Sequence, residues 1–277
     1  MIEKTEPPGH WQKNWECGGK GSFIKNAISN GMQQENQSGS TVCNMHYCGK
    51  NGRHSMKQRK WKIIFISLFS CVMMAAIELL WKPNYFYKSI CKIGLFGGTI
   101  LWICLKEKRS PSFFFKIQNK RQLLKAILLA VAVYVLILFV YGILGSKIDF
   151  SQMLNGLSQK EGISAKNFIW VTLYISCVNS LLEELLFRGY AYGFLKEDMP
   201  EWQASLFSAG LFAIYHIAIM VNWFSIWLFL LLLAGLFVAG LLFNYLDHEG
   251  GILPSWLLHI SANLAINTIG CLLMGVF

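Results

Sequence analysis

The sequence predicts an all-α fold: a polytopic membrane helix bundle of about seven transmembrane helices, with six or eight also compatible. Of its 277 residues, 54% are hydrophobic and 14% are charged, whereas about a quarter of a soluble domain is charged. The mean hydropathy is +0.41. The apolar residues gather into long runs, and a helix needs about 20 of them to cross about 30 Å of hydrocarbon.

Seven apolar runs qualify as spans. The second is shorter than the others and contains Lys92, and the third is the cleanest. The runs cover residues 63–81, 90–105, 126–144, 168–195, 203–220, 223–245 and 252–277.

The chain divides into a polar extension and a membrane domain. Residues 1–57 are rich in Gly, Asn, Ser, Gln and Lys and show no helical or strand periodicity. Such a segment buries too little apolar surface to offset its ordering entropy. We therefore expect a mostly disordered extension over 1–57 and a transmembrane domain over 58–277.

The net charge of +10 reflects orientation in the membrane. Basic residues cluster beside apolar runs, over 57–62 and again over 106–125. Lys and Arg next to spans favour the cytoplasmic side. We expect both segments and the N-terminal extension to be cytoplasmic, the lipid bilayer to be the partner, and no nucleic acid to be bound.

The fourth run contains the most unusual polar residues. Glu183 and Glu184 are adjacent and have leucines on both sides, and neighbouring helix residues point about 100° apart. Arg188 follows Glu184 by four residues, in the favourable order for an ion pair. Glu183 then lacks a local partner, and an ionisable group inside a span is a functional hypothesis by default. A buried ion pair between helices is the simpler alternative. Glu78 and Lys92 lie near run ends, where we expect them to snorkel.

Two histidines occur in later runs. Phe212 and His216 share a helix face in the fifth run, and His259 and Asn263 share one in the seventh. Glu184 lies 12 residues before Lys196, and His216 lies 13 residues after Gln203. At about 1.5 Å per residue, acid and imidazole fall at similar depth. We therefore expect Glu183, His216, His259 and Asn263 to converge within the bilayer.

These residues form three ordered motifs that resemble those of the CAAX protease and bacteriocin-processing family. That membrane family includes type II CAAX prenyl endopeptidases and bacterial abortive-infection or bacteriocin-immunity proteins. The resemblance covers roughly residues 120–270. Each motif alone is weak, and their order in nearby spans is what makes the match specific. The motifs are Glu183-Glu184-x-x-x-Arg188, Phe212-x-x-x-His216 and His259-x-x-x-Asn263.

The resemblance implies an intramembrane endopeptidase that cleaves a lipidated or hydrophobic protein or peptide. It implies that Glu183 and His216 activate a water and that His259 and Asn263 stabilise the oxyanion. Supporting structural positions are Glu184, Arg188 and Phe212.

We expect no cofactor, although a zinc alternative stays open. Two His and a Glu are the ligand set of thermolysin-type zinc sites, which here would be Glu183, His216 and His259. Those sites use His-Glu-x-x-His on one helix, and that sequence is absent.

Other functions are less well supported. The three aspartates all fall outside the apolar runs, so an intramembrane aspartyl pair is excluded. A non-catalytic immunity or scaffold protein is the main alternative, and a proton-coupled transporter is a weaker one. We expect a multi-pass protein of a bacterial plasma membrane.

Overall fold

The computed structural model describes residues 40–117 and 120–276, which are mainly helical and contain no β-strand. By contacts the chain separates into residues 1–53 and 54–277, and the second unit contains all seven candidate membrane spans. The prediction of a disordered extension over 1–57 stays a prediction, because residues 1–39 lie outside the described residues. Helix α2 begins at Ser40.

Seven helices in the described part of the chain are long and apolar enough to cross a membrane. The predicted all-α membrane bundle is therefore confirmed, and the protein is a multi-pass integral membrane protein. The seven are Gln58–Trp81, Tyr85–Lys106, Lys120–Lys147, Phe168–Asp198, Glu201–Met220, Ile226–Leu246 and Leu253–Leu273.

Several spans are built from more than one helical segment. The segments are α2 (Ser40–Ala76), η1 (Ile77–Trp81), α3 (Tyr85–Lys92), η2 (Ile93–Gly97), α4 (Gly98–Lys106), η3 (Pro111–Phe115), α5 (Lys120–Leu144), η4 (Gly145–Lys147), α6 (Ser151–Asn155), η5 (Gly156–Lys160), α7 (Phe168–Leu173), η6 (Tyr174–Asn179), α8 (Ser180–Glu184), η7 (Leu185–Tyr192), α9 (Gly193–Asp198), α10 (Glu201–Met220), α11 (Ile226–Leu246) and α12 (Leu253–Leu273).

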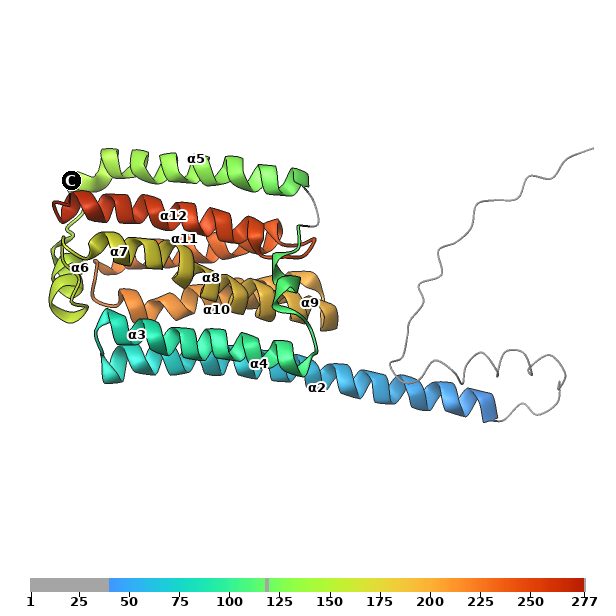
Figure 1. Ribbon diagram of the computed structural model, residues 1–277. Helices are drawn as coiled ribbons and strands as arrows, with labels where there is room; N and C mark the ends of the chain where they lie inside the picture. Colours follow the sequence, from blue (N-terminus) through green and yellow to red (C-terminus); the bar gives the residue numbers. More distant parts are fainter. Residues whose placement is uncertain (1–39, 118–119, 277) are drawn as a thin grey trace, which may run out of the picture. The chain divides into compact units, whose positions relative to one another are not determined.

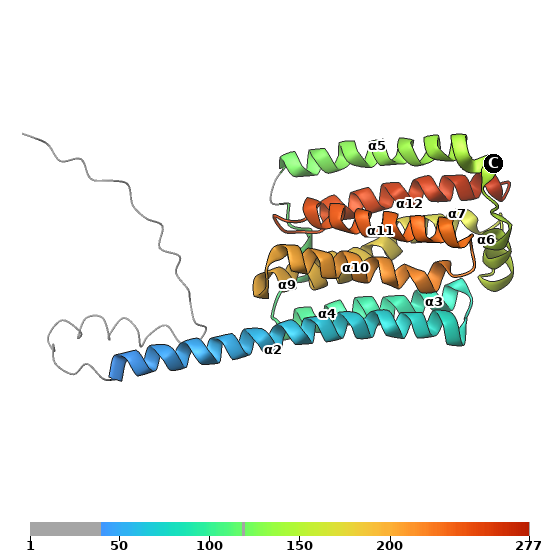
Figure 2. The same cartoon turned by 180° about the vertical axis from the view of Figure 1, so that it is seen from behind.

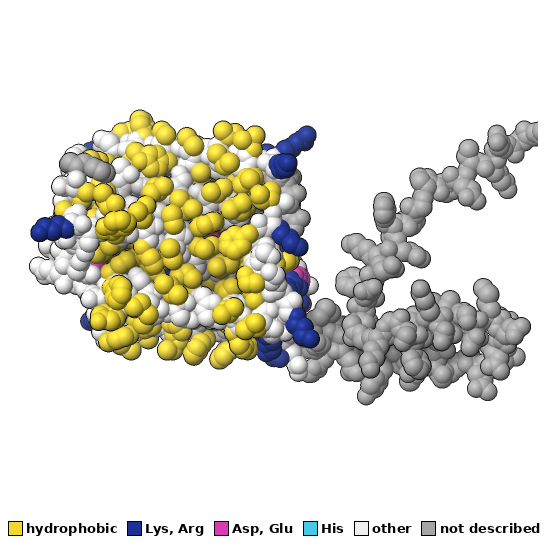
Figure 3. All heavy atoms as spheres, viewed as in Figure 1, with side chains coloured by type: hydrophobic (Ala, Val, Ile, Leu, Met, Phe, Trp, Pro, Cys, Tyr) yellow, Lys and Arg dark blue, Asp and Glu magenta, His cyan; other side chains and the backbone are white. Residues whose placement is uncertain are grey.

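The spans lie side by side with the fourth span near the middle. Figures 1 and 2 show α5 at one edge beside α12, and α2 with α3 and α4 at the opposite edge. On the face shown in Figure 3, hydrophobic side chains cover the bundle between its ends, and Lys and Arg gather mainly at the ends. This is the surface expected of a protein in lipid.

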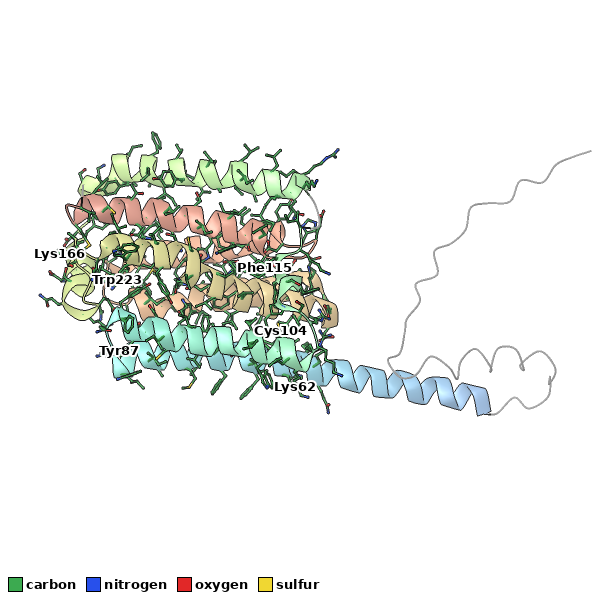
Figure 4. All side chains as sticks on the ribbon, in the orientation of Figure 1. Lys62, Tyr87, Cys104, Phe115, Lys166 and Trp223 are labelled. Atoms are coloured by element: carbon green, nitrogen blue, oxygen red, sulfur yellow. The ribbon has the colours of Figure 1, made fainter. Side chains whose placement is uncertain are left out.

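The two basic segments that the charge pattern assigned to one side of the membrane, 57–62 and 106–125, lie at the same end of the bundle. Tyr87 and Lys166 lie at one end, and Lys62 and Phe115 lie at the other (Figure 4). At the second end Arg59 pairs with Glu197 at 2.7 Å. Which end faces the cytoplasm remains a prediction.

Glu78 does not snorkel as expected. It is 8% exposed, and its Oε1 accepts hydrogen bonds from Lys88 Nζ at 2.7 Å and Lys160 Nζ at 3.0 Å. Lys88 also bonds Glu161 Oε1 at 2.6 Å. Because the neighbouring lysines neutralise the carboxylate in place, it need not reach the interface.

The fourth span has irregular helical winding around its two glutamates. The π-helical segments η6 and η7 flank α8, which carries Glu183 and Glu184. Such widened turns are frequent at functional sites. At Gly189 in η7, an added Cβ would lie 2.8 Å from the ring of Phe114. Glycine therefore lets the segment around η3 pack directly onto this span.

A buried aspartate fixes the start of α12, the helix that carries His259. Asp247 Oδ1 accepts from the Ser255 backbone N–H at 3.2 Å, and its Oδ2 accepts from the Ser255 hydroxyl at 2.5 Å. It thereby caps one of the free N–H groups of the helix start. Burial raises the pKa of the Asp247 carboxyl well above its usual range, although the Ser255 hydrogen bonds act in the opposite direction.

This burial predicts how Asp247 affects stability. Because its pKa is raised in the folded state, unfolding releases a proton above the unfolded value of about 3.9, so its contribution to stability falls as pH rises. Asp247→Asn keeps an acceptor for the Ser255 N–H and carries no charge. We expect the melting temperature of this variant minus that of the wild type, both measured in detergent, to increase by on the order of a few degrees from pH 4 to pH 8.

Asp247→Ala is the matched control because it removes the cap. We expect it to cost about 0.5–2 kcal/mol, as lost caps do. A wild type that gains stability over Asp247→Asn as pH rises would contradict the raised pKa.

Candidate functional site

Three polar side chains from three spans meet inside the bundle. Glu183 on α8 points its Oε2 at two imidazoles, with His259 Nε2 on α12 at 3.7 Å and His216 Nε2 on α10 at 3.9 Å. Glu183 is 1% exposed and His259 is 6% exposed. The structure therefore brings together three of the four residues that the sequence places at one point.

The hydrogen bonds of the two rings define which nitrogens carry protons. His216 Nδ1 lies 2.8 Å from the Phe212 carbonyl oxygen, and His259 Nδ1 lies 2.7 Å from Glu184 Oε1. A carbonyl or carboxylate oxygen can only accept, so each Nδ1 bears the hydrogen. Each neutral ring then presents its Nε2 as an acceptor.

Three acceptor atoms consequently face one another. Glu183 Oε2 accepts no hydrogen bond from any residue that the structure describes. An arrangement of one carboxylate oxygen and two imidazole lone pairs is suited to a molecule that supplies protons. The arrangement is therefore chemically a proton-accepting centre.

The other oxygen of Glu183 is fully engaged. Glu183 Oε1 accepts from Lys92 Nζ and, at 3.1 Å, from Asn179 Nδ2. Lys92 was expected to snorkel to the interface, and that interpretation is wrong because Lys92 is 5% exposed and paired. The signal, a single lysine inside an apolar run, is visible in the sequence, and the error was to place that lysine near the end of the span.

Glu184 connects the arginine to one of the imidazoles. Its Oε2 lies 3.3 Å from Arg188 Nε, which is the ion pair expected from their spacing, and both side chains are fully buried. The Arg188 guanidinium also lies 4.2 Å from the ring centroid of Phe212, within cation–π range. The contact of Glu184 with His259 was not foreseen.

Asn263 lies one helical turn beyond His259 and makes a different contact. Its Nδ2 donates to the Ile175 backbone carbonyl at 3.2 Å. Within the described range, no hydrogen bond joins it to Glu183 or to either imidazole. In the described residues Asn263 is therefore not hydrogen-bonded to the other three, and one of its amide hydrogens is left for another acceptor.

The zinc alternative requires a cluster of ligands. Over the part of the chain that the structure describes, no group of three or more His, Cys, Asp and Glu side chains is arranged to hold a metal ion. Glu183, His216 and His259 are suitable ligand types, and the zinc alternative stays a prediction.

Comparison with known proteins agrees with the motifs. Residues 165–265 match the family model described as type II CAAX prenyl endopeptidase Rce1-like. That stretch contains all three motifs, and the resemblance predicted from them is confirmed there. No curated protein and no solved structure matches the chain.

The buried pair of Glu184 and Arg188 generates a prediction for stability. Removing one partner of a buried ion pair leaves an uncompensated charge and costs about 3–5 kcal/mol. We expect Arg188→Met to lower the melting temperature in detergent more than the double change Glu184→Gln with Arg188→Met. The Gln side chain keeps an acceptor for His259 Nδ1. A double variant no more stable than Arg188→Met alone would contradict the pairing.

Proposed function

We propose that this protein is an intramembrane endopeptidase that hydrolyses a peptide bond in a lipidated or hydrophobic protein or peptide. The observation that carries the proposal is the free Glu183 Oε2, which faces His259 Nε2 at 3.7 Å and His216 Nε2 at 3.9 Å. The match of residues 165–265 to a CAAX prenyl endopeptidase model supports the same reaction class.

Glu183 and His216 act on the nucleophile. A water that lies between them donates its hydrogens to Glu183 Oε2 and His216 Nε2, and its oxygen attacks the carbonyl carbon. Glu183 takes the proton as general base and then delivers it to the leaving nitrogen. The C–N bond breaks as that proton arrives, so atoms and charges balance.

His259 and Asn263 stabilise the oxyanion. A neutral His259 presents a lone pair at Nε2, so it donates there only when the ring is protonated. Glu184, at 2.7 Å from Nδ1, stabilises that imidazolium. The amide hydrogen of Asn263 that does not bond Ile175 supplies the second donor. A single such donor is worth about 10²–10³ in kcat.

The proposal includes the setting of the enzyme. Its partners are the lipid bilayer and a protein or peptide substrate, and the N-terminal end lies on the cytoplasmic side of a bacterial plasma membrane. No structural observation favours the immunity, scaffold or transporter alternatives, and a cleavage assay separates them from a protease.

The acid and the imidazole are tested by substitution. We expect Glu183→Gln and His216→Ala to lower kcat on a farnesylated CAAX peptide in liposomes by at least about 10²–10⁴-fold, the usual contribution of general base catalysis. His248→Ala is the matched control, since His248 is exposed at the turn after α11. Undiminished cleavage by either site variant, with both proteins folded, would end the proposal.

Metal dependence is tested by chelation. Because the water is activated by Glu183 and His216, we expect cleavage to persist after incubation with 1,10-phenanthroline and EDTA. Loss of activity, followed by recovery on adding zinc, would instead establish the metal alternative.

A further inference from the structure

Lys92 is a buried cation that belongs to none of the three motifs. It lies in α3, in the second span, outside the stretch that matches the endopeptidase model. At 5% exposure it is far more buried than a surface lysine, and a charge inside the bilayer costs several kcal/mol unless it is paired. Its position therefore requires an explanation.

The partners of Lys92 form a closed polar ring with the carboxylate. Lys92 Nζ bonds Glu183 Oε1 and, at 2.6 Å, Asn179 Oδ1. Asn179 Nδ2 returns to Glu183 Oε1 at 3.1 Å. The ammonium also lies 5.0 Å from the ring centroid of Tyr215 and 5.4 Å from that of Phe96. The two aromatic rings limit the positions that the Lys92 ammonium can occupy.

The ring of contacts makes the two oxygens of Glu183 different. Two donors hold Oε1, whereas Oε2 accepts nothing from the described residues and faces both imidazoles. A carboxylate without these donors could rotate about its last bond and exchange its oxygens. One oxygen is thereby fixed structurally, and the other is free for chemistry.

We propose that Lys92 is the positioning residue of this site, which holds Glu183 ionised and turned so that Oε2 faces His216 and His259. This inference rests on the proposed protease function. The other ionisable groups that interact with Glu183 are Tyr215 and His216 on α10, His259 on α12, Cys71 on α2, Tyr85 on α3, Tyr174 on η6 and Arg188 on η7. Lys92 is the cation among them that pairs directly with Glu183.

The test compares Lys92→Met, Lys92→Arg and Lys88→Met in the full chain in liposomes, with a farnesylated CAAX peptide. We expect Lys92→Met to lower kcat on the order of 100-fold, as small misplacements do, with little change in KM. The acid limb of its pH profile moves to higher pH, because the carboxylate has lost its cation. Lys92→Arg keeps the wild-type limb.

Lys88→Met is the matched control, since Lys88 is a buried lysine one turn earlier that pairs with Glu78 and Glu161. We expect it to lose stability while keeping kcat and the acid limb. A folded Lys92→Met variant with wild-type kcat and a wild-type pH profile overturns the proposal. The proposal is also overturned if Lys88→Met shows the same loss of kcat and the same shift of the acid limb as Lys92→Met.

Two further measurements cover the other outcomes. If Lys92→Met does not fold, Asn179→Ala takes its place, since it removes one donor to Glu183 Oε1 and keeps the charge pair. A lower kcat with an unchanged acid limb of the pH profile supports the positioning role. A wild-type kcat overturns it. If the wild type cleaves nothing, infrared titration of the carboxyl band, with Glu183→Gln subtracted, still reads the protonation of Glu183. The proposal is supported if the pH at which Glu183 titrates stays unchanged in Lys92→Arg and rises in Lys92→Met. Lys92→Gln takes the place of Lys92→Met if that variant does not fold. An unchanged titration in the variant without the cation overturns the proposal.

Discussion

The site depends on the neutralisation of two adjacent carboxylates in a low-dielectric interior. Neither Glu183 nor Glu184 is accessible to solvent beyond 1%, and an unpaired ion there would be expelled or protonated. Each has its own cation, Lys92 for the first and Arg188 for the second. The same solution recurs where Glu78 meets Lys88. Pairing therefore decides which polar groups the bundle can keep inside.

Helical geometry then gives the two acids different tasks. Neighbouring residues project about 100° apart, so Glu184 reaches Arg188 and His259 Nδ1 while Glu183 reaches Lys92 and the Nε2 atoms. His259 lies between the two carboxylates, 2.7 Å from one and 3.7 Å from the other. One turn of one helix consequently sets both the orientation of an imidazole and the group it faces.

The sequence predicted the spans well because a bilayer demands long apolar runs, and those are visible without tertiary information. It also predicted the pairing of Glu184 with Arg188, which is local. It failed at Lys92 because the apolar run begins at Ile90, whereas the helix begins at Tyr85. Lys92 is therefore much deeper than the run suggests. The hydrogen bond of Asn263 to the Ile175 carbonyl was also not predicted. Helical spacing shows which residues share a face, but it does not show which residue of another helix that face contacts.

The charge balance of the cluster explains why a membrane interior can host the proposed reaction. With His216 neutral and His259 protonated for its oxyanion role, the cations Lys92, Arg188 and His259 face the carboxylates Glu183 and Glu184. When Glu183 takes a proton from water, the negative charge moves to the substrate oxygen, and the total is unchanged. The reaction relocates a charge by a few ångströms beside cations already in place, so no ion has to enter the bilayer. A preorganised site of this kind stabilises developing charge without reorganising.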